Sequence, residues 1–152
     1  MTDPIAFSTA TAKFGLPYLF AGQSQKEFTV NEAHARMDVL LHPVVEGFTN
    51  SPPPVPRNGE AWIVSSEALA EWAGREDAIA AFSDGRWLFI EPSQPMLIFD
   101  RSAGQYVSYN EGWSAPADVV APTGGANIDV EARNAIEQII DALRRIGVFS
   151  AL

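Results

Sequence analysis

The feature that most constrains this chain is a helical pattern near its C-terminus. Residues 130–146 contain neither glycine nor proline. Apolar side chains recur there at steps of four and three residues, the a/d pattern of a coiled coil: Ala132, Ile136, Ile139, Leu143 and Ile146. Asp129 is the predicted N-cap and Gly147 the predicted C-terminal stop. The pattern predicts an amphipathic helix within residues 129–152.

A lone helix of this length is marginal in water, so its apolar stripe must be covered. It either docks onto its own β-domain or pairs with copies of itself around a symmetry axis. The preceding linker, residues 116–128, is rich in proline and glycine and lets the helix leave the domain. We therefore expect Ala132, Ile136, Ile139, Leu143 and Ile146 to form an oligomer interface. Isoleucine at both a and d, with leucine at one a, favours more than two strands.

Residues 60–115 have the pattern of short strands. Ala61–Val64 is β-branched and aromatic. Two hairpins follow, each with an aromatic residue on either side of its turn: Ala78–Phe82 with Arg86–Ile90, and Met96–Phe99 with Gln105–Tyr109. Residues 67–72, between the first strand and the first hairpin, read as a short helical turn or a loop. We expect an antiparallel meander of about five strands with aromatic side chains on one face.

Residues 1–50 read as an extended N-terminal arm followed by a helix. Thr29 to Glu32 has the form of a capping box, which makes Thr29 the predicted N-cap. Apolar residues behind it fall on one face, and His42-Pro43 should end the helix: Val30, Ala33, Met37, Leu40 and Leu41. A proline-rich spacer, residues 51–59, follows. The predicted class is α+β, a small antiparallel β-meander domain with an N-terminal arm and helix and a C-terminal oligomerising α-helix.

Composition excludes several classes of site and partner. The chain has no cysteine, which excludes disulfides, thiol nucleophiles and zinc sites with sulfur ligands. Its formal net charge is −9, and residues 58–121 hold ten acidic against three basic side chains. Such a surface repels phosphate backbones and anionic lipids, so neither nucleic acid nor a membrane is an expected partner. No secretory signal or membrane-spanning helix is expected.

No catalytic motif stands out, and we expect no enzyme activity, cofactor or metal. Phosphate-binding loops, nucleophile elbows and zinc-protease motifs are absent from the sequence. His34 and His42, with Glu32 or Asp38, are the one candidate metal set, but such residues are more often solvated or capping. Glu76 and Asp77 are adjacent and therefore point in different directions.

The tryptophans offer a binding hypothesis. Trp62 and Trp87 lie in predicted strands and are expected in the core. Trp72 and Trp113 lie beside glycines in predicted loops, which makes them the candidate contacts with a sugar or a partner protein. A carbohydrate-binding module for attachment to host surface polysaccharide is therefore the alternative to an assembly protein.

The stretch LPYLFAGQSQKEFTVNEA, residues 16–33, resembles the opening of a domain of unknown function. That domain occurs in particle proteins of alphaproteobacterial prophages and gene transfer agents. The resemblance extends over about residues 13–114, through the motifs WAG, DGRW and GW. Residues 130–148 also resemble the helix that often ends such phage proteins.

The resemblance implies a structural protein of a phage-like particle, made in the bacterial cytoplasm. A short chain with this domain and a terminal helix is similar to the head-spike base of a gene transfer agent, which joins a capsid vertex to a receptor-binding fibre. Many family members continue into long fibre regions, whereas this sequence stops at Leu152. It therefore resembles an adaptor more than a complete tail fibre. Gln23, Gln25, Asn31 and Glu32 are then expected to satisfy backbone groups or meet a neighbouring subunit.

Overall fold

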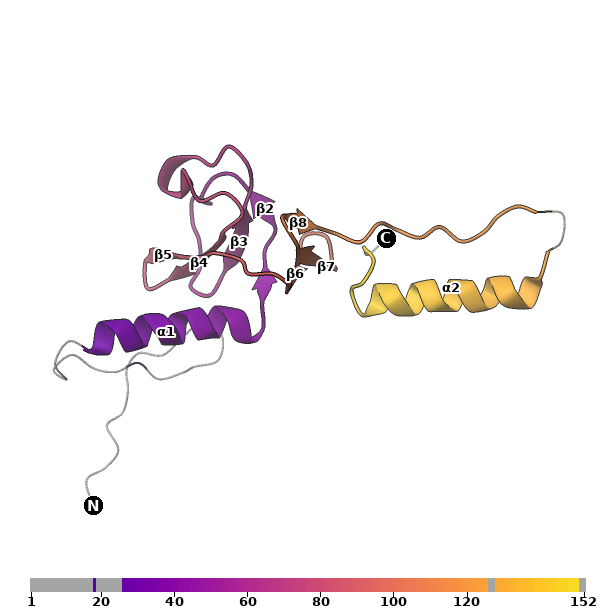
Figure 1. Cartoon of the computed structure of the whole chain (residues 1–152), viewed down its shortest axis with the longest axis horizontal. Coiled ribbons are helices and arrows are strands. Elements are labelled where there is room, and N and C mark those ends of the chain that lie inside the picture. The colour runs from indigo at the N-terminus through magenta and orange to yellow at the C-terminus, as the bar shows by residue number, and fades with distance from the viewer. Residues whose placement is uncertain (1–17, 19–25, 126–127, 151–152) are drawn as a thin grey trace, which may run out of the picture.

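The computed structural model describes residue 18 and residues 26–125 and 128–150, and its fold is α+β (Figure 1). The predicted N-terminal arm, with Gln23 and Gln25, lies outside the described residues except for Tyr18. In the described part, two helices flank eight strands: α1 (Lys26–Leu41), β1 (Val44–Val45), β2 (Phe48–Thr49), β3 (Ala61–Val64), β4 (Ile79–Ser83), β5 (Arg86–Ile90), β6 (Met96–Asp100), β7 (Gln105–Tyr109), β8 (Trp113–Ser114) and α2 (Val130–Arg145). Neither helix has the length and hydropathy needed to cross a bilayer, within the residues described.

Both predicted hairpins form. In the first, Asp84 and Gly85 have φ of 49° and 77°, the left-handed pair that a two-residue turn of type I′ requires. The aromatic residues beside each turn are direct cross-strand partners. The rings of Phe82 and Trp87 lie 5.0 Å apart, and those of Phe99 and Tyr106 lie 5.2 Å apart. These edge-to-face contacts set the register of each hairpin.

The hairpins do not form one meander, and this part of the prediction is wrong. They belong to two separate sheets, ordered β2-β3-β4-β5 and β1-β6-β7-β8. Strand β1 pairs in parallel with β6, and β2 pairs in parallel with β3. The chain passes from one sheet to the other at Gly47, where a Cβ atom would lie 2.9 Å from Ser102 Oγ. Residues 44–49 are thus part of the β-domain, and the proline-rich spacer connects two neighbouring strands.

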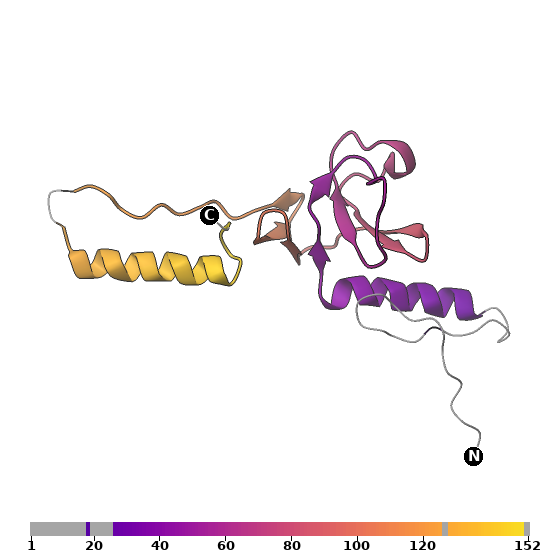
Figure 2. The ribbon, with the colours of Figure 1, turned by 180° about the vertical axis from the view of Figure 1, so that it is seen from behind.

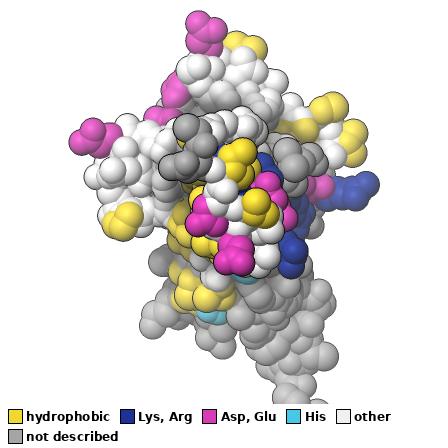
Figure 3. All heavy atoms as spheres, turned by 90° about the vertical axis from the view of Figure 1, so that its right-hand side faces the viewer, with side chains coloured by type: hydrophobic (Ala, Val, Ile, Leu, Met, Phe, Trp, Pro, Cys, Tyr) yellow, Lys and Arg dark blue, Asp and Glu magenta, His cyan; other side chains and the backbone are white. Residues whose placement is uncertain are grey.

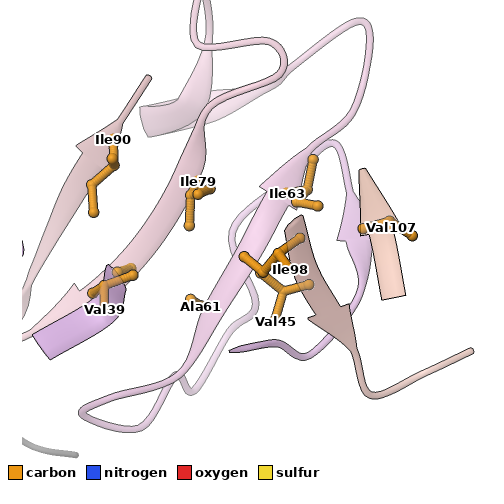
Figure 4. Close-up of a cluster of buried hydrophobic side chains, with 9 residues drawn as sticks. Val39, Val45, Ala61, Ile63, Ile79, Ile90, Ile98 and Val107 are labelled. Atoms are coloured by element: carbon orange, nitrogen blue, oxygen red, sulfur yellow. The ribbon is translucent and has the colours of Figure 1, made fainter. Parts of the chain in front are cut away.

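The hydrophobic core lies between the two sheets. Each sheet contributes aliphatic side chains to it, and α1 adds one (Figure 4): Val39, Val45, Ala61, Ile63, Ile79, Ala81, Ile90, Ile98 and Val107. Alternate residues of the central strands point inward, as Ala61 and Ile63 of β3 do. We call the two sheets and their connections the β body.

Helix α1 ends where predicted but begins earlier and buries a different face. It starts at Lys26, so Thr29 lies within the helix and is not its N-cap. Met37, Leu40 and Leu41 of the predicted stripe are 45%, 39% and 63% exposed, whereas Val39 is buried. On a helical wheel Val39 lies nearly opposite Leu41. The apolar stripe of α1 therefore does not face the described core.

Helix α2 begins and ends as predicted. Asp129 Oδ1 accepts a hydrogen bond from the amide of Ala132 at 2.9 Å. At the other end, the amide of Gly147 donates to Arg144 O at 2.9 Å and that of Val148 to Leu143 O at 2.8 Å. This pair of bonds is a Schellman motif, which requires a left-handed residue, and Gly147 has φ of 76°.

Gly147 also attaches α2 to the β body, because its carbonyl accepts a 2.6 Å hydrogen bond from the amide of Tyr106. Replacing Gly147 with alanine is expected to destabilise the protein by about 1–2 kcal/mol, through the positive φ and through the contact of the new Cβ with Phe99. That Cβ would lie 2.8 Å from Phe99 Cε2. Chemical denaturation measures the loss.

Gly74→Ala is the matched control for this prediction. Gly74 has φ of 77°, but a Cβ atom there would meet nothing within 4 Å. It should show the cost of the backbone conformation alone. Equal losses of stability for Gly147→Ala and Gly74→Ala would contradict a close contact between Gly147 and the Phe99 ring.

Candidate functional site

The C-terminal arm, which we define as residues 115–125 together with α2, projects from the β body (Figures 1 and 2). The extended segment runs back alongside the helix. Arg133 ties the two together by donating to Pro122 O at 2.8 Å and to Gly124 O at 2.6 Å. Nearer the body, Ser150 Oγ donates to the carboxylate of Asp118. The arm is therefore a defined two-layer unit.

The extended segment covers only one side of α2. Ile140 is 5% exposed, and it lines a hollow of about 550 Å³ together with residues 118–121. Ile140 occupies the e position beside the a/d stripe. The intramolecular packing of α2 thus uses Ile140, which the sequence analysis had not included in the predicted interface.

The predicted interface residues remain open in the single chain. Ile136, Ile139 and Ile146 are 39%, 59% and 63% exposed. Ala132 is also exposed, and Leu143 is half-buried. Of the two alternatives left by the sequence, docking of this stripe onto the chain's own β-domain is not seen among the described residues.

The open face is uncharged along the whole helix. Ala135 and Ala142 lie at the g positions beside the stripe and are exposed, so they widen the face without adding charge. The charged side chains of α2 fall at other positions: Glu131, Arg133, Glu137, Asp141, Arg144 and Arg145. Figure 3 looks at the molecule from the side of the arm and shows hydrophobic side chains beside acidic and basic ones. An apolar face of this width is typical of helices that pack in bundles.

The prediction that Trp72 lies on a contact surface is wrong. Trp72 ends a single turn of 3₁₀ helix, η1 (Ala70–Trp72), and is completely buried. Its ring centroid lies 5.0 Å from that of Trp87 and 6.4 Å from that of Trp62. Trp62 and Trp87, predicted in the core, are only partly buried around it.

Trp113 is partly buried on β8. Its Nε1 donates to Asp77 O at 2.8 Å, and its ring lies 5.2 Å from that of Tyr109. The side chain also packs against the main core. These contacts give Trp113 a structural role and leave only part of its ring to a partner.

Glu76 and Asp77, the adjacent acidic residues considered in the sequence analysis, both make hydrogen bonds within the fold. Glu76 Oε1 accepts from the amide of Ala68 at 3.2 Å, and Asp77 uses its backbone to hold Trp113. Across the described residues, no group of three histidine, aspartate or glutamate side chains is placed to hold a metal ion.

The sequence analysis missed a cavity between α1 and the β4–β5 hairpin. Its volume is about 630 Å³, and Arg36, Arg75 and Arg86 all line it together with Trp87 and Phe89. The three arginines come from α1, the loop after η1 and β5. Their spacing in the sequence carries no periodic signal, so only the packing of α1 on the hairpin brings them together.

Residues 30–114 match the family described as "Protein of unknown function (DUF2793)", and this is more than half of the chain. The matched region runs from α1 through β8 and includes both sheets. The protein therefore belongs to the DUF2793 family. No curated protein matches the chain. The C-terminal arm lies outside the matched residues.

Proposed function

We propose that this protein is a non-enzymatic structural adaptor of a phage-like particle. In this proposal it is the head-spike base of a gene transfer agent and links a capsid vertex to a receptor-binding fibre. The DUF2793 match and the resemblance of residues 16–33 to particle proteins support the class. The observation that carries the proposal is the uncharged, exposed face of α2 on a projecting arm.

The heptad spacing of the open face suits packing against another helix with the same spacing. A second copy of α2 is such a helix. Each of the three exposed isoleucines would contribute about 1 kcal/mol on becoming fully buried, since roughly half of each side chain is already covered. In an oligomer this burial free energy is gained by every copy. The total offsets the entropy that the copies lose on association. Isoleucine at both a and d favours more than two copies, and the geometry of a particle allows a trimer or a pentamer.

In the proposed assembly, α2 holds the copies together while the β bodies remain available to other particle proteins. Exposed apolar side chains on α1 suit a second contact: Met37, Leu40 and Leu41. The alternative of a carbohydrate-binding module was predicted through Trp72 and Trp113, and the burial of Trp72 removes its main support.

The test is to purify particles from the bacterium that produces the protein, with an epitope tag on the β body. We expect the tagged chain to co-sediment with capsid protein in a density gradient at a fixed ratio. Deletion of its gene should leave particles that lack the vertex spike in electron micrographs. Particles that retain their spikes without the gene, or a chain that stays wholly in the cell lysate, would contradict the proposal.

A further inference from the structure

The cavity between α1 and the β4–β5 hairpin is lined by three arginines in a protein that is acidic overall. Residues 58–121 contain only three basic side chains, and two of them, Arg75 and Arg86, line this cavity. Arg36 reaches it from α1. Its volume of about 630 Å³ lies within the range of small-molecule sites.

Two of the guanidinium groups contact the same residue, Phe89. Arg36 donates through Nε and Nη2 to Glu32 Oε1, at 3.1 and 2.8 Å, and through Nη1 to Phe89 O at 3.3 Å. The guanidinium of Arg75 stacks over the Phe89 ring, 5.1 Å from its centroid, and lies 3.8 Å from Glu91. Both side chains remain about half exposed. The donors are thus held in place yet open to a ligand.

The wall of the cavity supplies an aromatic surface. Trp87 packs edge-on against Trp72 and Phe82, at 5.0 Å in each case, which fixes its ring. Trp87 is partly buried and is among the residues that line the cavity. Acceptors for hydroxyl groups line the same space, on Glu32, Ser83 and Asp84.

A ligand that uses all three parts carries a negative charge, an apolar ring face and hydroxyl groups. A neutral sugar would leave the guanidinium groups without a role, and a phosphate dianion would be repelled by Glu32 and Asp84. A carboxylated sugar ring places one negative charge on the arginines, its C–H face on Trp87 and its hydroxyls on the acceptors. We propose that this cavity binds a carboxylated pyranose, either free or as a unit of an acidic polysaccharide. This inference does not depend on the proposed adaptor role.

The test is isothermal titration of the full chain with trigalacturonate and with galacturonic acid. We expect saturable binding of trigalacturonate and at least tenfold weaker binding of neutral galactotriose. Comparable affinity for the single sugar acid would assign the site to a free ligand, and a clear preference for the trimer would assign it to a polysaccharide. Absence of saturable trigalacturonate binding, or equal binding of galactotriose or citrate, would overturn the proposal.

The variants Arg75→Gln and Arg86→Gln should each weaken trigalacturonate binding by about tenfold, because each removes one charge-assisted contact. Arg101→Gln is the matched control. Arg101 is outside the cavity and pairs with Glu46 Oε1 at 2.6 Å on the surface. A tenfold loss in this control, or no loss in either cavity variant, would show that binding reflects overall charge and not this site.

Discussion

Replacing Trp72 with alanine is expected to lower the free energy of unfolding by about 3–5 kcal/mol, the range for removing a fully buried aromatic side chain. Trp72 has no exposed surface and lies at the centre of the cluster with Trp62 and Trp87. Its removal leaves a cavity between the loop that contains η1 and the sheet formed by β2, β3, β4 and β5. That loop also loses its main packing contact with the sheet. Urea denaturation followed by circular dichroism at one fixed protein concentration measures the loss.

Two further variants sharpen this prediction. Trp72→Phe keeps an aromatic ring at this position. It also removes the indole Nε1, which has no hydrogen-bond partner among the described residues. Its loss in the free energy of unfolding should therefore be less than half of that for Trp72→Ala. Leu69→Ala, in the same loop at a side chain that is 55% exposed, should cost under about 1 kcal/mol. Similar losses for Trp72→Ala and Leu69→Ala would contradict a central role for Trp72.

Local signals in the sequence were enough to predict the hairpins. Asp84-Gly85 demands a left-handed turn, and Phe82 and Trp87 on either side can pair in only one register. The ends of α2 were predictable for the same reason, since Asp129 and Gly147 act on backbone groups within a few residues of themselves. Interactions between residues that are close in the sequence can therefore be predicted from the sequence alone.

Features that depend on distant partners were missed. Strands β1 and β2 have two residues each, too few for a period of two to show. Each is stabilised by parallel pairing with another strand, β1 with the distant β6 and β2 with β3 across the proline-rich spacer. Gly74, close to Trp72 in the sequence, suggested an exposed loop. The side chain of Trp72 is nevertheless buried in a cluster with Trp62 and Trp87. The arginines of the cavity likewise have no common pattern in the sequence.

The two helices show the limit of amphipathic periodicity. The apolar residues predicted to form a stripe on α1 and on α2 are largely exposed, and neither set covers the described core. In α1 the buried contact is Val39, and in α2 it is Ile140, each of which lies off the main stripe. Periodicity identifies an apolar face, but it does not identify what covers that face.

Ile139→Asp is expected to convert the proposed oligomer into a monomer while leaving the β body folded. Ile139 is 59% exposed in the single chain, so an aspartate there meets water and costs the monomer little. In the proposed assembly the same side chain lies at a central d position, where several copies would bury carboxylates together without partners. Light scattering coupled to size exclusion gives the molar mass, and circular dichroism reports the fold.

Gln138→Asp is the matched control, because it adds the same charge one residue away at a c position that is exposed. It should leave the molar mass unchanged, since a c side chain faces solvent in a coiled coil. An Ile139→Asp protein with the mass of the unaltered chain would show that this face does not hold the copies together. Dissociation of both variants to the same extent would show that net charge, and not the apolar stripe of α2, governs association.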